Sequence, residues 1–276
     1  SVGIITAREG LYTVAGVGVS IKAGGLAVSA GVVTVTDGYI DVSDSSRNTR
    51  IGSNAGDSFS GTTTDNTLIG YDAGTAITSG DYNTAVGSYA LDATTTASSN
   101  TAVGYNALSA NTTGSNNVAV GHAALDANTT GANNTALGHG ALDVSTTGDS
   151  NTAVGAYALT ANTTADNNTA VGRQALYSNT TADDNTALGH SSLFANTTGA
   201  NNTAVGRAAL VANTTGHSNV AVGARALTAN TTGSRNVGVG NSSLDSNTTG
   251  ANNTAVGYET LISSTTTNNN TALGAY

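Results

Sequence analysis

"NTAVGYNALSANTTGSN", residues 100–116, is one unit of a tandem repeat, and this repeat decides the fold. Its opening asparagine recurs every 17 residues from Asn66 to Asn270 without insertion or deletion, which gives twelve complete units. A looser copy begins at Asn48, 18 residues before Asn66. A short fixed period of this kind is typical of solenoids, in which each unit stacks on the next.

The positions of the unit differ in their chemistry. The fifth position, Gly104 here, is glycine in every unit, which suits a turn with positive φ or a close approach of two backbones. The run T-A-V before it alternates with period two, as a β-strand does. We expect the large side chains of Val103 and Leu108 to point into the coil. The small residues Ala102 and Ala107 would then form a face for close packing.

The length of the unit selects the architecture. Seventeen residues are too few for a helix-turn-helix repeat, and the recurring glycines oppose a helix. An extended path at ~3.3 Å per residue gives a perimeter of roughly 56 Å, which matches one rung of a parallel β-helix or β-roll with two strands and two turns. The half around residues 105–110 alternates poorly, so one helical turn per rung remains open there. The sequence predicts an all-β parallel β-solenoid.

Domain organisation and assembly follow from the same pattern. Residues 48–276 form the predicted rod, and residues 1–47 alternate apolar and polar residues between glycines, which predicts a β-rich collar or shaft segment. Each rung has few large apolar side chains, and the small-residue columns suit contact between chains. We therefore expect a homotrimer along a common axis, with a thin monomeric β-helix as the alternative.

Composition excludes several classes of protein. Only 9% of residues are charged and 4% are aromatic, and Pro, Cys, Met and Trp are absent, so few large side chains could fill a compact core. A formal charge of −9 does not fit a nucleic-acid-binding surface. The absence of Cys excludes disulfides and thiolate metal sites. No apolar run approaches the length of a membrane span, so we expect no membrane insertion.

The Asn-Thr-Thr triplets, such as the one at Asn111, match the acceptor pattern for N-linked glycans. Glycans on rungs about 4.8 Å apart would collide, so we expect the asparagines to form hydrogen-bonded ladders instead. The predicted structural positions include these ladder and corner residues: Asn100, Asn117, Asn134, Gly104, Gly121 and Gly138.

The sixth position varies beside invariant neighbours, which indicates exposure to solvent. It could display stacking and charged groups to a glycan or protein, or be a tolerant outer face without a ligand. The candidate binding residues are Tyr71, Tyr105, His122, His139, Arg173, His190, Arg207 and Tyr258. His122 and His139 lie on adjacent rungs, but we expect no metal and no cofactor there. At the tenth position, Tyr177, Phe194 and Val211 form a small apolar strip that could equally be a packing contact.

The motif NTAVGxxA is similar to the head repeats of trimeric autotransporter adhesins, whose usually shorter units build a trimeric left-handed β-roll. The combination of GGLAVSAGVVTVTDGYIDVS, NTRIGSNAG, NTLIGYDAGTAITSGDYNTAVG and the Asn-Thr-Thr-Gly units more closely resembles bacteriophage tail fibres. Such fibres often continue into a self-cleaving intramolecular chaperone, and the resemblance implies at most that one was removed.

The resemblance implies an adhesive fibre: a phage tail fibre shaft, extracellular and part of a virion, that attaches to a host surface. Its partners would be further copies of itself, other virion components and a host receptor such as a glycan. A bacterial trimeric surface adhesin is the alternative. An ice-binding β-solenoid is less favoured because the consecutive Thr112 and Thr113 should diverge. The acidic residues are scattered and no Ser/His/Asp grouping recurs, so we expect no enzyme.

Overall fold

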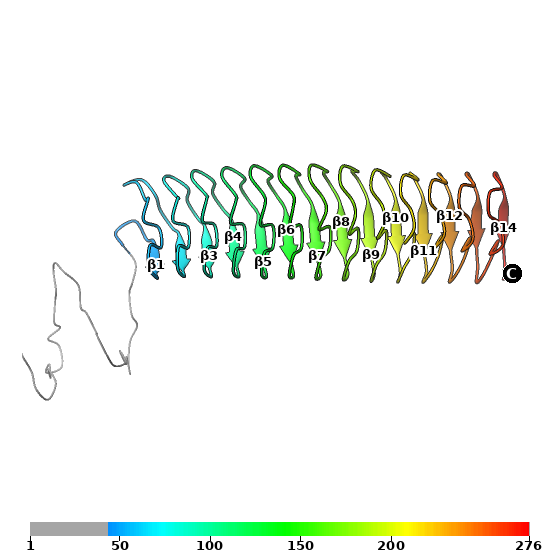
Figure 1. Cartoon of the computed structure of the whole chain (residues 1–276), viewed down its shortest axis with the longest axis horizontal. Helices are drawn as coiled ribbons and strands as arrows, with labels where there is room; N and C mark the ends of the chain where they lie inside the picture. The colour runs from blue at the N-terminus through cyan, green and yellow to red at the C-terminus, as the bar shows by residue number, and fades with distance from the viewer. Residues whose placement is uncertain (1–43, 276) are drawn as a thin grey trace, which may run out of the picture. The chain divides into compact units, whose positions relative to one another are not determined.

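A computed structural model of the chain describes residues 44–275, which form a parallel β-solenoid (Figure 1). The predicted collar at 1–47 lies almost entirely outside these residues. The described part contains fourteen strands of three residues and no helix. The strands are β1 (Thr49–Ile51), β2 (Thr67–Ile69), β3 (Thr84–Val86), β4 (Thr101–Val103), β5 (Val118–Val120), β6 (Thr135–Leu137), β7 (Thr152–Val154), β8 (Thr169–Val171), β9 (Thr186–Leu188), β10 (Thr203–Val205), β11 (Val220–Val222), β12 (Val237–Val239), β13 (Thr254–Val256) and β14 (Thr271–Leu273).

All fourteen strands belong to one parallel sheet, in which each strand pairs with its neighbours in the sequence. The register aligns each residue with its equivalent one unit later, as in the pairing of Ala102 with Ala119. The predicted all-β parallel solenoid with 17-residue rungs is therefore confirmed. Because equivalent positions stack, every column of the sequence becomes a line of side chains along the solenoid.

The core of the coil is built from the small residues. Ala102, Ala107 and Leu108 are each 0% exposed within the single chain, whereas Val103 is half-buried. Successive residues of a strand point to opposite faces, so an inward Ala102 places Val103 on the outer face. The prediction that Val103 points inward was wrong. The small-residue columns close one coil on itself, so they do not supply the contact between chains on which the trimer was argued.

The second half of each rung is neither a strand nor a helical turn. Its alternate residues adopt left-handed backbone, with φ of 55° at Asn106 and 53° at Leu108. Backbone hydrogen bonds still connect the rungs there, because the Leu108 N–H donates to the Ala124 carbonyl oxygen at 3.0 Å. The prediction of two strands per rung was therefore wrong, since alternating left-handed residues interrupt the extended path without breaking the stacking.

Leucine rarely adopts the left-handed conformation, which costs an L-residue about 1–2 kcal/mol. Complete burial of the Leu108 side chain returns about 1.5–3 kcal/mol. Two rungs lack this leucine and have Gly56 and Gly74 there, with φ of 62° and 58°. Leu68 and Ile77 occupy the space vacated at Gly74, where an added Cβ would lie 2.9 Å from Leu68 Cδ2 and 2.8 Å from Ile77 Cδ1. The volume of the core is thus conserved although its residues differ.

The glycine at the fifth position is required for two reasons. Gly104 has a φ of +139°, and an added Cβ would lie 2.4 Å from the carbonyl oxygen of Gly121 on the next rung. Gly121 repeats this geometry against Gly138. Neither the conformation nor the space admits a side chain, which explains why this position does not vary.

Two columns of buried asparagine hold the rungs in register. The Asn117 backbone N–H donates to Asn100 Oδ1 at 2.9 Å, and the Asn134 N–H donates to Asn117 Oδ1 at 2.9 Å. Asn117 Nδ2 also donates to the Gly131 carbonyl oxygen at 2.8 Å. The first position of the repeat therefore supplies a side-chain ladder in addition to the backbone ladder.

The asparagines of the Asn-Thr-Thr triplets form the second ladder. Asn128 Nδ2 donates to Asn111 Oδ1 at 2.8 Å and to the Gly131 carbonyl oxygen at 3.0 Å. The side chains of all eight triplet asparagines are 0% exposed: Asn111, Asn128, Asn162, Asn179, Asn196, Asn213, Asn230 and Asn247. Their amide nitrogens are enclosed and engaged in the folded rod, where they could not carry a glycan.

Candidate functional site

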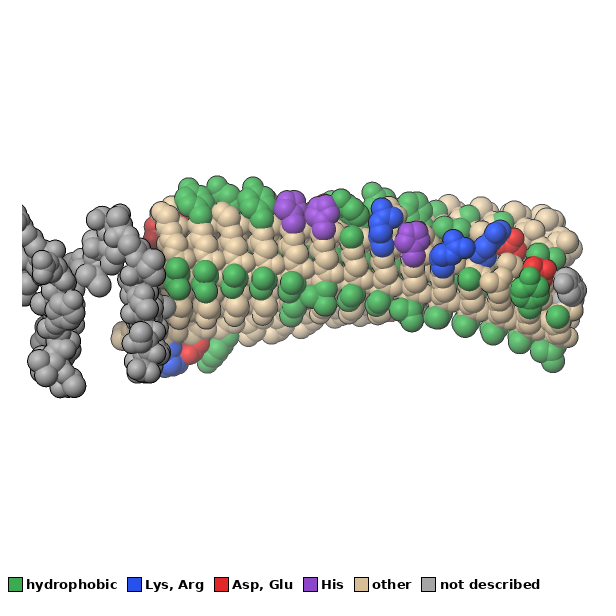
Figure 2. All heavy atoms as spheres, turned by 90° about the horizontal axis from the view of Figure 1, so that it is seen from below, with side chains coloured by type: hydrophobic (Ala, Val, Ile, Leu, Met, Phe, Trp, Pro, Cys, Tyr) green, Lys and Arg blue, Asp and Glu red, His purple; other side chains and the backbone are tan. Residues whose placement is uncertain are grey.

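The variable sixth position and its neighbour, the seventh, lie on the outside of the solenoid. Figure 2 shows a row of side chains that runs from hydrophobic residues through histidine to arginine along the rod. The candidate residues of the sixth position are all exposed: Tyr71, Tyr105, His122, His139, Arg173, His190, Arg207 and Tyr258. The structure divides them into an aromatic part and a basic part.

The aromatic part is a continuous series of six rings, here called the aromatic ladder. Its members are Tyr71, Tyr89, Tyr105, His122, His139 and Tyr157. The distances between successive ring centroids are 5.4, 5.9, 5.4, 5.0 and 4.8 Å. Stacked rungs hold the rings at this separation, within the range over which aromatic pairs attract.

Two members of the ladder, Tyr89 and Tyr157, were missed by sequence reasoning. Both occupy the seventh position rather than the sixth. Their rungs carry the small residues Ser88 and Ala156 at the sixth position. On these two rungs the aromatic residue stands one position later in the sequence, and the series of ring contacts remains continuous. The compensating pair of small and aromatic residues was a signal in the sequence that could have identified them.

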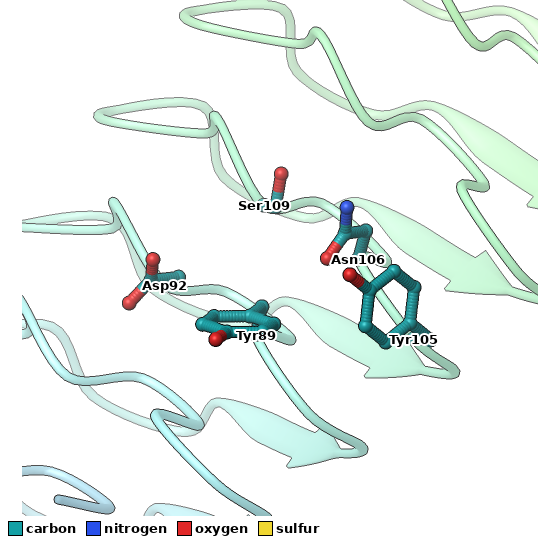
Figure 3. A pocket seen from close by; sticks show the side chains of 5 residues that line it. All are labelled: Tyr89, Asp92, Tyr105, Asn106 and Ser109. Atoms are coloured by element: carbon teal, nitrogen blue, oxygen red, sulfur yellow. The ribbon is translucent and has the colours of Figure 1, made fainter.

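A surface pocket of about 350 Å³ opens on the ladder between two rungs (Figure 3). It is lined by Tyr89 and Asp92 from one rung and by Tyr105, Asn106 and Ser109 from the next. The two tyrosine rings are perpendicular, with an interplanar angle of 90° and centroids 5.9 Å apart. The pocket thus combines two aromatic rings with a carboxylate, an amide and a hydroxyl group.

An acidic column at the tenth position runs beside the ladder, through Asp92, Asp126 and Asp143. The Ser109 hydroxyl donates a hydrogen bond to Asp126. Among residues 44–275, no hydrogen-bond donor or cationic group pairs with the Asp92 carboxylate. Partial burial raises the pKa of Asp92, and the nearby carboxylate of Asp72 raises it further.

The pKa of Asp143 is also raised, first by partial burial and then by Asp126. His139 and His122 of the ladder act on it in the opposite sense. Asp143 thus interacts electrostatically both with the acidic column and with the two histidines of the ladder.

The charge of the whole chain is concentrated in this part of the sequence. Residues 51–172 contain nine Asp and no Lys or Arg, which accounts for the entire formal charge of −9. Residues 173–276 contain four Arg and four acidic residues, and residues 1–50 are likewise balanced. The aromatic ladder therefore lies on the acidic stretch of the solenoid.

The basic part follows on the next rungs, through Arg173, His190 and Arg207. An Arg173 guanidinium nitrogen lies 3.5 Å from His190 Nε2. The apolar strip at the tenth position lies on the same rungs, where Tyr177 and Phe194 stack with an interplanar angle of 7° and centroids 5.1 Å apart. The side chains of this strip are half-buried, so they contribute to packing between neighbouring rungs.

Further along, Arg225 forms an ion pair with Asp245 at 3.3 Å. Tyr258 lies at the far end of the column and is 51% exposed. His122 and His139 interact as ladder rings, and the described residues contain no group of three or more His, Cys, Asp or Glu suited to a metal ion. Within residues 44–275 no helix could cross a membrane.

The threonines of the Asn-Thr-Thr triplets diverge in their roles. The hydroxyl of Thr112 donates to the carbonyl oxygen of Thr129 at 2.9 Å, and Thr112 is half-buried. Thr113 is exposed. Only one threonine of each such pair is therefore fully presented to solvent.

Neither models of known protein families nor curated proteins match this sequence. The class of protein is thus defined by the fold alone, which is a parallel β-solenoid of fourteen stacked strands with a ring-bearing outer column.

Proposed function

We propose that the protein is the shaft of an adhesive fibre, a phage tail fibre, that attaches to a host cell surface through its aromatic ladder. The observation that carries the proposal is the unbroken line of six rings on the outside of a hydrogen-bonded solenoid. Aromatic faces stack on apolar surfaces while their polar edges face water, and their rigid side chains lose little entropy on contact. A surface glycan has this mixture of apolar and hydroxyl groups.

The architecture supports a mechanical role beside the adhesive one. The backbone ladder and the first-position asparagine ladder connect every rung, and the triplet asparagines add a second ladder that is interrupted at Ser145. In a solenoid each rung contacts only its neighbours. Such a rod gains length by repetition without a change in cross-section. The alternative, a bacterial surface adhesin, uses the same surface and differs in what carries the rod.

Association of copies into a trimer is part of the proposal, but through a different surface from the alanine columns. The fourth position forms an apolar column on the outer face of the sheet, where Val120 is 37% and Leu188 is 47% exposed. A second copy has the same rung spacing and would match this column along its length. The mass in solution, measured by light scattering, tests this association, and a monomeric mass would contradict it.

The adhesive function is tested by binding of the full chain to whole bacterial cells and to immobilised cell-surface polysaccharides. We expect retention on at least one of these surfaces and its loss when Tyr71, Tyr89 and Tyr105 are all replaced by Ala. A matched variant replaces three exposed threonines, Thr113, Thr130 and Thr147, by Ala and should bind normally. Retention that survives removal of the tyrosines would refute the role of the ladder.

The carrier of the rod is tested by immunogold labelling with antibodies against the solenoid. Labelled phage tails would support the tail fibre, and a labelled cell envelope would support the surface adhesin. Neither an ice-binding surface nor a catalytic function is needed by the proposal. Thermal hysteresis in the purified protein, or hydrolysis of a polysaccharide, would contradict this assignment.

A further inference from the structure

The pocket between Tyr89 and Tyr105 differs from the rest of the ladder in the groups that it gathers. Its two rings meet at a right angle, and the Asp92 carboxylate reaches the same hollow from the tenth position (Figure 3). Faces of aromatic rings attract cations, and a carboxylate beside them adds a charged hydrogen-bond acceptor. Two rings and a carboxylate around one space form a site suited to an organic cation.

The surroundings of the pocket favour the same kind of ligand. No Lys or Arg occurs between residues 51 and 172, whereas nine Asp lie there, so the local potential attracts cations and repels anions. The Asp92 carboxylate has no cationic or hydrogen-bonding partner among the described residues, so a ligand would be its first. Acidic capsules or sulfated glycans would be disfavoured on this stretch.

We propose that this pocket binds the protonated amino group of an amino-sugar glycan, with the sugar ring against Tyr89 or Tyr105 and the ammonium group at Asp92. The proposal deepens the proposed function, on which it rests, by naming the chemical class of the glycan. The Asn106 amide offers both a donor and an acceptor for sugar hydroxyl groups. Ser109 is less available, because its hydroxyl already donates to Asp126.

The pattern continues beyond the pocket, which suits a polymer rather than a single sugar. His122 and His139 extend the ladder, and Asp126 and Asp143 extend the acidic column on the same two rungs. A chain of amino sugars laid along the rod would therefore meet a ring on every rung on one side, and on the other side the carboxylates of Asp92, Asp126 and Asp143, with Ser109 between the first two.

The test compares three hexasaccharides by calorimetry with the full chain: glucosamine, its neutral N-acetylated counterpart, and the anionic galacturonate. We expect the glucosamine hexamer to bind about tenfold more tightly than the neutral hexamer, a difference of ~1.4 kcal/mol. Added salt should reduce this preference, because the contact is between exposed charges. The galacturonate hexamer should bind more weakly to the ladder than the neutral one.

The variant Asp92→Asn should remove most of the preference for glucosamine while binding of the neutral hexamer persists. Asp184→Asn is the matched control, because it removes the same charge at an exposed residue outside the ladder, where φ of 60° suits asparagine. Circular dichroism and thermal melting verify that both variants fold. Tyr105→Ala should weaken binding of both the cationic and the neutral hexamer.

The outcomes separate this inference from the proposed function. Equal binding of the cationic and neutral hexamers, unchanged by Asp92→Asn, would overturn the amino-sugar assignment and leave a glycan-binding ladder. Preference for the galacturonate hexamer at the ladder would overturn it as well. No binding of any glycan, including those on whole cells, would overturn both.

Discussion

The solenoid has an acidic stretch, residues 51–172, and a following stretch, residues 173–275, which is called the basic stretch here for its four arginines although four acidic residues balance them. The two stretches share one interior and differ in their outer columns. At residues 71–157 the rings occupy the sixth or seventh position of all six rungs, and carboxylates occupy the tenth position of three of them. At residues 173–211 the arrangement is reversed, with arginine and histidine at the sixth position and stacked rings at the tenth. The buried Ala, Leu and Asn columns continue through both. The columns that hold the rungs together are therefore separate from the columns that vary on the surface.

This separation follows from the way a solenoid stacks. Each inner residue contacts its own equivalents above and below, so a change there is felt along the column. Each outer residue meets solvent on one side and tolerates substitution. Inner substitutions should have the same effect in both stretches, whereas outer substitutions should affect the ligands of one stretch only.

The largest effect is expected from a side chain at the fifth position. Gly104→Ala in the acidic stretch and Gly206→Ala in the basic stretch each force a Cβ to 2.4 or 2.5 Å from a carbonyl oxygen of the next rung. With positive φ in addition, each should cost at least about 4 kcal/mol. Urea denaturation measures the loss. Gly61→Ala is the control, because its Cβ meets nothing within 4 Å. A large difference between the two stretches would contradict a shared interior.

A smaller but still substantial loss is expected from the asparagine ladder. Asn117→Ala leaves the Asn134 N–H without its acceptor and removes one of the two amide donors to the Gly131 carbonyl, which keeps its bond from Asn128. A buried orphan costs about 1–3 kcal/mol and a lost hydrogen bond about 1 kcal/mol, so we expect a loss of about 2–4 kcal/mol. Asn219→Ala removes equivalent bonds in the basic stretch and should match it.

Thr113→Ala, at an exposed position, serves as the control for both ladder variants and should change stability by less than about 0.5 kcal/mol. Urea denaturation again provides the measurement. Unequal losses at Asn117 and Asn219 would show that the two stretches differ inside as well as outside.

Most of the architecture was predictable because a strict period leaves few alternatives. The 17-residue spacing, the parallel stacking and the role of Gly104 all follow from columns of equivalent residues. The orientation of the strand was not predicted correctly. Val103 is larger and more apolar than Ala102, so the prediction placed the Val103 side chain in the core. The left-handed backbone at Leu108 gives the narrow coil its shape, and no propensity rule assigns that conformation to leucine.

The candidate site was predictable in part. Variation at the sixth position indicated exposure, and the structure places those side chains on the surface. The continuity of the ladder was not visible, because Tyr89 and Tyr157 lie one position further along and reach the line only in three dimensions. The pocket depends on Asp92, whose column looked like scattered acids until the rungs were stacked.

A modest effect is expected when the charge of the basic stretch is reduced. Arg207→Gln should weaken binding of the galacturonate hexamer by at most about fivefold, since exposed charge pairs contribute up to ~1 kcal/mol. Calorimetry at low salt measures it. Arg235→Gln removes the same charge outside the sixth and seventh positions and should have a smaller effect. Asp92→Asn should not weaken binding of the galacturonate hexamer. Weaker binding in this variant would show that both stretches share one binding surface.

The smallest effect concerns the protonation of Asp92. Its pKa lies above the ordinary value of 3.8, because burial and then Asp72 disfavour the charged form. Ionisation therefore opposes folding at pH values above the folded pKa, and this penalty is relieved as the pH falls through the raised pKa toward the unfolded value. Asp72→Asn should lower the pKa of Asp92 without restoring the ordinary value, because the burial remains. Carboxyl ¹³C NMR titration measures the shift, with Asp184→Asn as the control. An unchanged titration in Asp72→Asn would mean that the carboxylates of Asp72 and Asp92 on adjacent rungs do not interact, and that Asp92 would act on a ligand independently of Asp72.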